Sequence, residues 1–107
     1  MTEDKWSKLI DGLTHRTERG GLSWDAPTDD TLIVLLEVGA VRIERKGPLQ
    51  FVLTLRNEAG RPIESQAVDR WERSDLQEQM GALWELGWRK ALQADDVWDK
   101  ALSELTG

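Results

Sequence analysis

The chain has 107 residues, of which 39% are hydrophobic and 32% are charged. This balance predicts one soluble globular domain over residues 1–107 and excludes a disordered chain. Twenty acidic and fourteen basic residues give a net charge of −6, and no basic stripe runs through the sequence, which disfavours binding to nucleic acid. The absence of cysteine excludes disulfides, thiolate metal sites and a cysteine nucleophile.

The longest apolar run, Leu32–Leu36, is far too short to cross a bilayer. The first residues also lack the basic segment and the apolar run of a secretory signal peptide. We therefore expect a cytoplasmic protein that makes no contact with a membrane.

A helix is predicted at the start of the chain, where apolar residues recur with helical spacing at Trp6, Leu9, Ile10 and Leu13. Thr2 is the expected N-cap of this helix, and Gly20–Gly21 is expected to end it. Leu22–Trp24 alternates like a short extended segment, and residues 26–30 are predicted to form a loop.

Three strands are predicted next, at residues 31–38, 40–46 and 49–56, because apolar and polar residues alternate there. A two-residue turn at Gly39–Ala40 would pair Leu36 with Ile43, and a loop over residues 46–48 would pair Ile43 with Phe51. Pro62–Val68 is a candidate edge strand, since Pro62 cannot donate to a ladder. The expected sheet is therefore an antiparallel meander of three or four strands.

The last third of the chain is predicted to be helical. Ser74 and Gln77 match a capping box, and an apolar stripe with a mean spacing of about 3.6 residues runs from Leu76 to Leu105. One long helix satisfies this spacing, but residues 93–96 carry weak helix signals, so we expect a break that gives helices over 74–92 and 95–106. The predicted fold class is α+β, with an N-terminal helix, the meander and one or two C-terminal helices.

Two segments carry a resemblance to known proteins. They are Trp6-x-x-Leu9-Ile10 followed by Thr17-x-x-Gly20-x-Leu22-x-Trp24, and the ending from Leu83 to Leu102. In these motifs the chain resembles a group of small uncharacterised bacterial and phage proteins. The resemblance implies an α-β-β-β-α fold and implies no activity and no catalytic residues.

Catalytic chemistry is not indicated by the sequence. Asp11, His15 and Glu18 share one face of the first predicted helix, but a metal site needs further ligands that the pattern does not offer. No glycine-rich loop opens a helix to hold phosphate, and no nucleophile–base pair is legible. We therefore predict a protein that is not an enzyme and that uses no metal and no cofactor.

The sequence has more apolar surface than a one-sided sheet requires. Ile33, Leu35 and Val52 are expected on the face opposite the core, and Trp84 and Trp88 widen the apolar stripe of the C-terminal helix. Either a C-terminal helix covers the second face of the sheet, or that face binds a partner protein or a second copy.

The first functional hypothesis is therefore a protein-interaction or adaptor module, with self-association as one form of it. Its partner-binding residues would be Ile33, Leu35, Val52, Trp84 and Trp88. An alternative is a small-ligand sensor with a pocket between sheet and helices, lined by Trp24 and Trp98. A third hypothesis, based on small size, acidity and the resemblance described above, is a phage or mobile-element accessory protein that acts on a host system.

Overall fold

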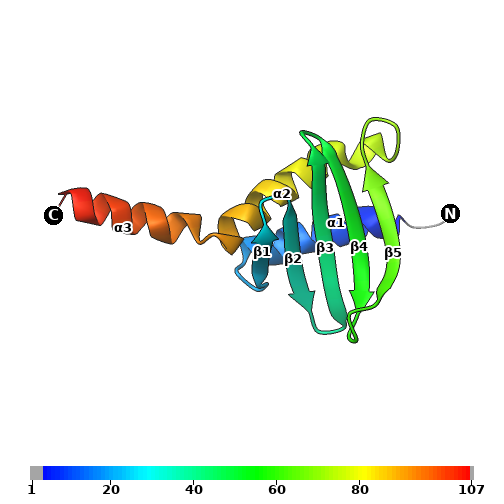
Figure 1. The fold of residues 1–107 in the computed structure, drawn as a ribbon, viewed down its shortest axis with the longest axis horizontal. Helices are drawn as coiled ribbons and strands as arrows, with labels where there is room; N and C mark the ends of the chain where they lie inside the picture. The colour runs from blue at the N-terminus through cyan, green and yellow to red at the C-terminus, as the bar shows by residue number, and fades with distance from the viewer. Residues whose placement is uncertain (1–3, 107) are drawn as a thin grey trace.

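The computed structural model describes residues 4–106 as an α+β domain. A helix precedes a five-stranded antiparallel sheet, and two helices follow it (Figure 1). The elements are α1 (Lys5–Glu18), β1 (Trp24–Thr28), β2 (Thr31–Leu36), β3 (Gly39–Gly47), β4 (Gln50–Asn57), β5 (Pro62–Val68), the 3₁₀ turn η1 (Ser74–Leu76), α2 (Gln77–Ala91) and α3 (Ala94–Thr106). The predicted fold class is confirmed, with five strands in place of three or four.

The additional strand is β1, which includes part of the segment expected to be a loop. Trp24 pairs with Val34 and Asp25 pairs with Ile33, and the ladder becomes irregular before Thr28. Ala26 and Pro27 occupy this irregularity at the edge of the sheet, where proline is tolerated because few ladder hydrogen bonds depend on it. The prediction of a loop was wrong for residues 26–28, where strand pairing outweighs these local breaker signals, and correct for residues 29–30, which form the turn to β2.

Strand pairing differs from the predicted register, but the two faces of the sheet are as predicted. The first hairpin turns at residues 37–38, so Leu32 lies opposite Ile43, and in the next hairpin Ile43 lies opposite Leu53. Gly39 belongs to β3 and not to the turn. It lies so close to β4 that an added Cβ would be 1.9 Å from the carbonyl oxygen of Arg56, so only glycine fits at this position. Both register shifts are even, so the apolar residues keep their side of the sheet.

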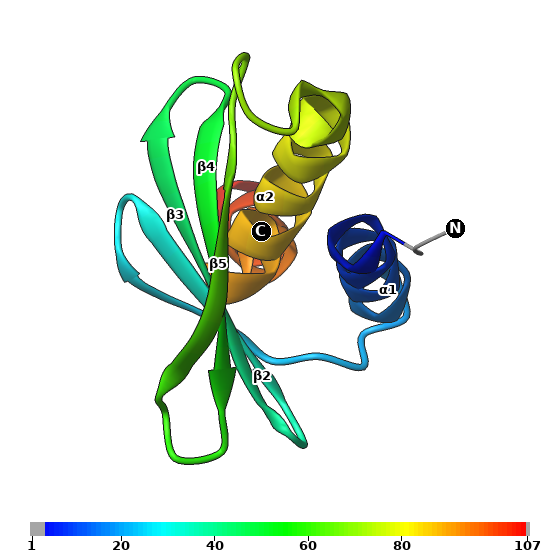
Figure 2. The same ribbon diagram turned by 90° about the vertical axis from the view of Figure 1, so that its right-hand side faces the viewer.

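Helices α1 and α2 lie on one face of the sheet (Figure 2). The core between the layers consists of thirteen buried hydrophobic residues: Ile10, Leu13, Leu32, Val34, Val41, Ile43, Phe51, Leu53, Val68, Leu76, Met80, Leu83 and Trp84. Every sheet residue in this set comes from one side of the pleat.

Trp24 joins the edge of the sheet to both helices. Its indole lies against Gly87 of α2, where an added Cβ would be 2.7 Å from the ring. The indole N–H donates a hydrogen bond to Oγ1 of Thr17 in α1 at 2.9 Å, and the Thr17 hydroxyl donates to the carbonyl of Leu13 at 2.6 Å. The polar end of a half-buried indole is thereby satisfied inside the layer, as such a group requires.

The N-cap of α1 is Asp4. Its carboxylate accepts hydrogen bonds from the backbone N–H groups of Trp6 at 3.2 Å and Ser7 at 3.3 Å. The predicted cap, Thr2, lies outside the described residues. Asp is as good a cap as Thr because its side chain also reaches the free donors of the first turn.

Arg73 connects the start of α1 to the start of η1. Its guanidinium pairs with Asp4 and, at 2.8 Å, with Asp75, which lowers the pKa of both carboxyls and raises the pKa of Arg73. Arg73 itself adopts φ 49°, so the chain turns here before the helix. Ser74 and Gln77 do not form the predicted capping box, because the chain enters α2 through the 3₁₀ turn and neither N-cap position makes a side-chain hydrogen bond.

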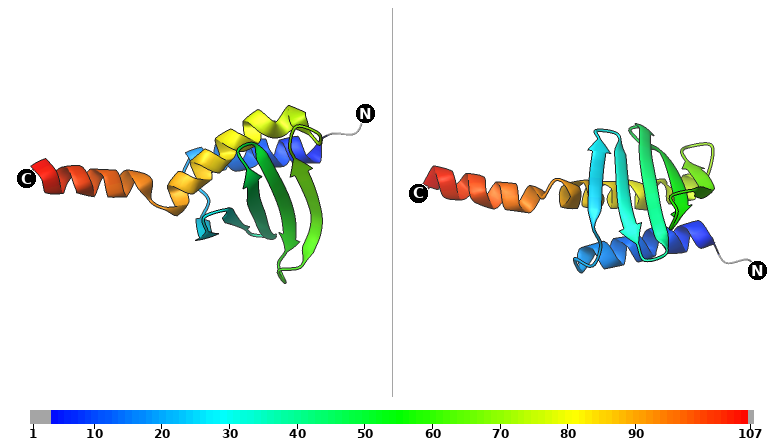
Figure 3. Two further views of the ribbon diagram at one scale, coloured as in Figure 1. Left: turned by 45° about the horizontal axis from the view of Figure 1, so that its top comes forward. Right: turned by 60° about the horizontal axis from the view of Figure 1, so that its bottom comes forward.

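The predicted break in the C-terminal helix is confirmed. Helix α2 ends at Ala91, Gln93 adopts the left-handed conformation with φ 53°, and α3 begins at Ala94. Figures 1 and 3 show α3 extending away from the body of the domain. The radius of gyration, 15.1 Å, accordingly exceeds the value of about 13 Å for a compact chain of this length.

We predict that Gly87→Ala lowers the free energy of unfolding by about 1–3 kcal/mol, because the new methyl group must displace the Trp24 ring. Gly12→Ala in α1 is the matched control, since an added Cβ there meets nothing within 4 Å. It should stabilise the protein by about 0.5–1 kcal/mol through helix propensity. Urea unfolding followed by tryptophan fluorescence measures both, and equal effects at the two glycines would contradict the role given to Trp24.

A second prediction concerns Arg73→Gln and its pH dependence. Asp4 and Asp75 have folded pKa values below their ordinary value of 3.8, so their contribution to stability is present above that pH and is lost as the pH falls through the folded values. The variant should therefore be less stable than the wild type at neutral pH, and the difference should shrink in acid. NMR titration should show both carboxyl pKa values rising towards 3.8 in the variant; unchanged values would refute the pairing.

Candidate interaction surface

The sheet face opposite α1 and α2 carries no helix of the described chain (Figure 2). We name this surface the open face. Its residues come from all five strands and alternate with the core residues: Asp25, Ile33, Leu35, Ala40, Arg42, Glu44, Val52, Thr54, Arg56, Ser65 and Ala67. Of the two explanations considered for the apolar residues here, coverage by a C-terminal helix of the same chain does not occur in this structure.

Cross-strand pairing brings the predicted residues of this face together. Ile33 pairs with Arg42, which pairs with Thr54 on the next strand. Leu35, in the neighbouring row, is 62% exposed, whereas Ile33 and Val52 are half-buried. The open face therefore has apolar residues on β2 and β4 with an arginine between them.

Two cations on this face have shielded donors. The Nε atoms of Arg42 and Arg56 are buried and make no hydrogen bond to the described residues. Arg42 Nε lies 3.5 Å from a carboxylate oxygen of Glu44, and Lys46 Nζ lies 2.8 Å from the other oxygen. Lys46 and the two arginines hold the pKa of Glu44 below its ordinary value. Both Nε atoms are covered by the protein's own atoms, so a ligand on the open face would meet other parts of these two guanidinium groups.

Helix α3 presents a second apolar surface. None of its residues is buried, and its large apolar side chains share one side of the helix because of their spacing. We name them the α3 stripe: Val97, Trp98, Leu102 and Leu105. Trp98 is 62% exposed and Leu105 is 83% exposed. An isolated helix of thirteen residues is marginally stable in water, so α3 gains stability from any surface that covers the stripe.

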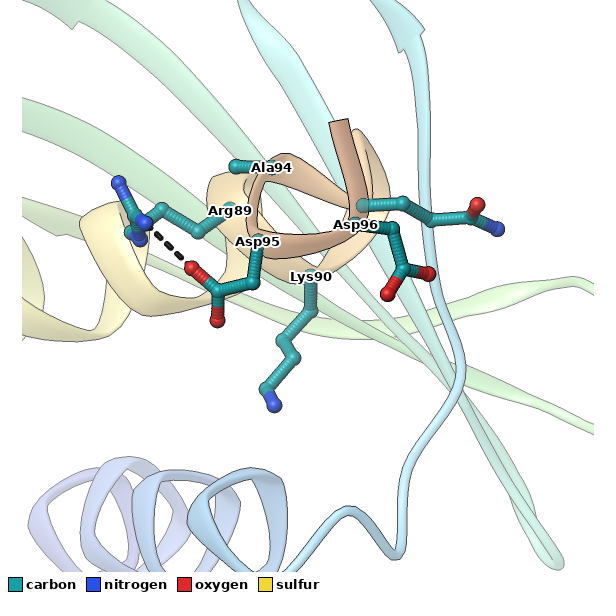
Figure 4. Close-up of a pocket in the computed structure, with 6 residues that line it drawn as sticks. Arg89, Lys90, Ala94, Asp95 and Asp96 are labelled. Atoms are coloured by element: carbon teal, nitrogen blue, oxygen red, sulfur yellow. Dashed lines mark hydrogen bonds and ion pairs between the residues drawn. The ribbon is translucent and has the colours of Figure 1, made fainter. Parts of the chain in front are cut away.

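The junction between α2 and α3 is charged. Arg89 Nη2 donates to a carboxylate oxygen of Asp95 at 2.6 Å across the break, and Lys90 and Asp96 line the same small hollow (Figure 4). Two cations and two carboxylates balance one another here. The exposed Arg89–Asp95 pair contributes less than about 1 kcal/mol to the free energy of unfolding.

The predicted aromatic site residues lie apart from the open face. Trp84 is only 4% exposed, and its ring centroid lies 6.0 Å from Phe51 and 5.9 Å from Trp88, with which it stacks. Trp88 is half-buried on the same helix. Both rings therefore contribute to the helix layer, and we leave them out of the interaction surface.

The two tryptophans of the alternative ligand pocket have different surroundings. Trp24 packs against the core and Gly87, whereas Trp98 is exposed on α3.

The candidate interaction surface also includes residues that the sequence analysis did not single out, namely Arg56 and most of the α3 stripe. Strand alternation alone would have placed Arg56 beside Arg42.

Comparison of the chain with models of known protein families, with curated proteins and with solved structures gives no match. Among residues 4–106, no group of three or more His, Asp or Glu side chains is arranged to hold a metal ion. No helix in this range combines the length and apolarity needed to span a membrane.

Proposed function

We propose that this protein is a non-enzymatic protein-binding module that acts through the open face and the α3 stripe. The observation that carries the proposal is that Leu35 on the open face and the α3 stripe are exposed, and that no other described helix lies over either surface (Figures 1 and 2). Contiguous exposed apolar surface on a soluble domain is typical of interaction sites.

The composition of the two surfaces supports this proposal. Protein interfaces are enriched in tryptophan and arginine, which combine a large contact area with directional hydrogen bonds. Trp98 supplies such an anchor on α3, and Arg42 and Arg56 supply donors among the aliphatic side chains of the sheet. By contrast, Asp11, His15 and Glu18 all lie exposed on α1, where they resemble an ordinary solvated helix face.

We predict that the double variant Ile33→Thr/Leu35→Thr abolishes binding of partner protein while the fold is kept. Threonine retains the β-branching of Ile33 and introduces it at Leu35, and strands favour such side chains, so the free energy of unfolding should change by less than about 1 kcal/mol. The measurement is co-purification of proteins with the tagged full chain, an untagged copy of the chain included, quantified by mass spectrometry.

Leu49→Thr is the matched control, because Leu49 is also exposed, at 52%, but lies in the turn between β3 and β4. It should retain every captured partner. Equal capture by the wild type, the double variant and the control would contradict a role for the open face. Unfolding of the double variant would instead identify Ile33 and Leu35 as structural residues.

A further inference from the structure

We infer that the partner of the open face is α3 of a second copy of this chain, in a reciprocal dimer in which each α3 lies on the open face of the other copy. This inference rests on the proposed function and names its partner. In this dimer the open face of each copy binds the α3 stripe of the other copy, so one contact covers both surfaces.

The charges of the two surfaces are complementary. Helix α3 carries four acidic residues and one lysine: Asp95, Asp96, Asp99, Glu104 and Lys100. Asp99 lies one turn before Leu102, and Glu104 lies two turns after Val97, so carboxylates border the α3 stripe on both sides. The central strands β3 and β4 present two cations on the open face, Arg42 and Arg56, and the single carboxylate between them, Glu44, is already paired with Lys46. Asp25 adds one carboxylate only at the β1 edge.

Docking of α3 also supplies what each surface lacks. The carboxylates beside the stripe provide acceptors for the partly exposed guanidinium groups of Arg42 and Arg56. Leu35, Ile33 and Val52 provide apolar contact for the stripe itself. An apolar centre with charged pairs at its border is the usual anatomy of a protein interface.

The surface area of the domain fits a dimer. The accessible surface is 7391 Å², whereas a compact monomer of this mass exposes about 6,100 Å². The excess of about 1,300 Å² is more than the roughly 800 Å² that each partner contributes to a standard interface. The projecting α3 and the uncovered sheet face are the visible origin of this excess.

The open face of a second copy is a better binding surface for α3 than the open face of its own chain. In this structure α3 leaves α2 at the left-handed Gln93, and the Arg89–Asp95 pair spans the break. Figure 3 shows α3 directed away from the sheet in both views. A reciprocal exchange about a two-fold axis forms the same contact twice and closes the assembly, which is the commonest arrangement of homo-oligomers.

The test uses light scattering to measure the native mass of the full chain and of two charge-reversed variants. Arg56→Glu reverses a charge on the open face, and Asp99→Arg/Glu104→Arg reverses the charges that border the stripe. We expect twice the 12.2 kDa mass of one chain for the wild type and roughly tenfold or more weaker association for each variant alone. An equimolar mixture of the two variants should recover the doubled mass, because in the mixed dimer both docked helices again meet a face of opposite charge.

Controls separate a lost interface from a lost fold. Arg16→Glu makes the same charge change at an exposed position of α1 and should leave the doubled mass unchanged. Circular dichroism checks that each variant is folded, and if Arg56→Glu unfolds, Arg56→Gln replaces it as the face variant and should weaken association by itself.

Three outcomes would overturn the inference: a wild type with the mass of one chain, variants that associate as the wild type does, or a mixture that stays monomeric. The proposed function is tested independently of the dimer. If the wild type is monomeric but a different protein is captured and then lost in Ile33→Thr/Leu35→Thr, the module stands and the second copy is the wrong partner. If neither association nor capture occurs, both proposals fail.

Discussion

The contact of Trp24 with Gly87 and Thr17 is the constraint on which the rest of the structure depends. One side chain on the edge strand lies against the backbone of α2 and donates a hydrogen bond to α1. The two helices are thereby held on the same face of the sheet, over the apolar side of its pleat. The missing side chain of Gly87 is what permits this approach, since any Cβ at that position would overlap the ring.

Once both helices are on one face, the opposite face has no cover within the described chain. Helix α3 does not provide it, because the left-handed Gln93 turns the chain outward after Ala91. The domain therefore has two layers, with a half-apolar sheet surface and a projecting amphipathic helix as its exposed remainder. The uncovered face follows from the placement of both helices on one side, and the projection of α3 follows from Gln93; the proposed reciprocal dimer would cover both surfaces with one repeated contact.

Particular residues show how far the sequence predicts the surface. Ile33, Leu35 and Val52 were assigned to the outer face from alternation, and they lie there although the register of both hairpins differs from the prediction. The assignment survives because side chains alternate with a period of two, so an even shift keeps each residue on its side. Trp84 and Trp88 have helical spacing that fits a core or an interface equally well, and burial of Trp84 distinguishes these possibilities only in three dimensions.

The sequence by itself determined the three helices, the strands β2 to β5, their order and the helix break, because hydrophobic periodicity and breaker residues act over a few neighbouring positions. Only the tertiary structure decided that Trp24–Thr28 is a strand, that Arg73 joins Asp4 to Asp75, and that α3 extends away from the sheet. Strand β1 depends on pairing with β2, the Arg73 link depends on a contact with the distant Asp4, and the direction of α3 depends on one backbone angle at Gln93. Local pattern carries no information about such contacts, since their energy exists only when the layers are assembled.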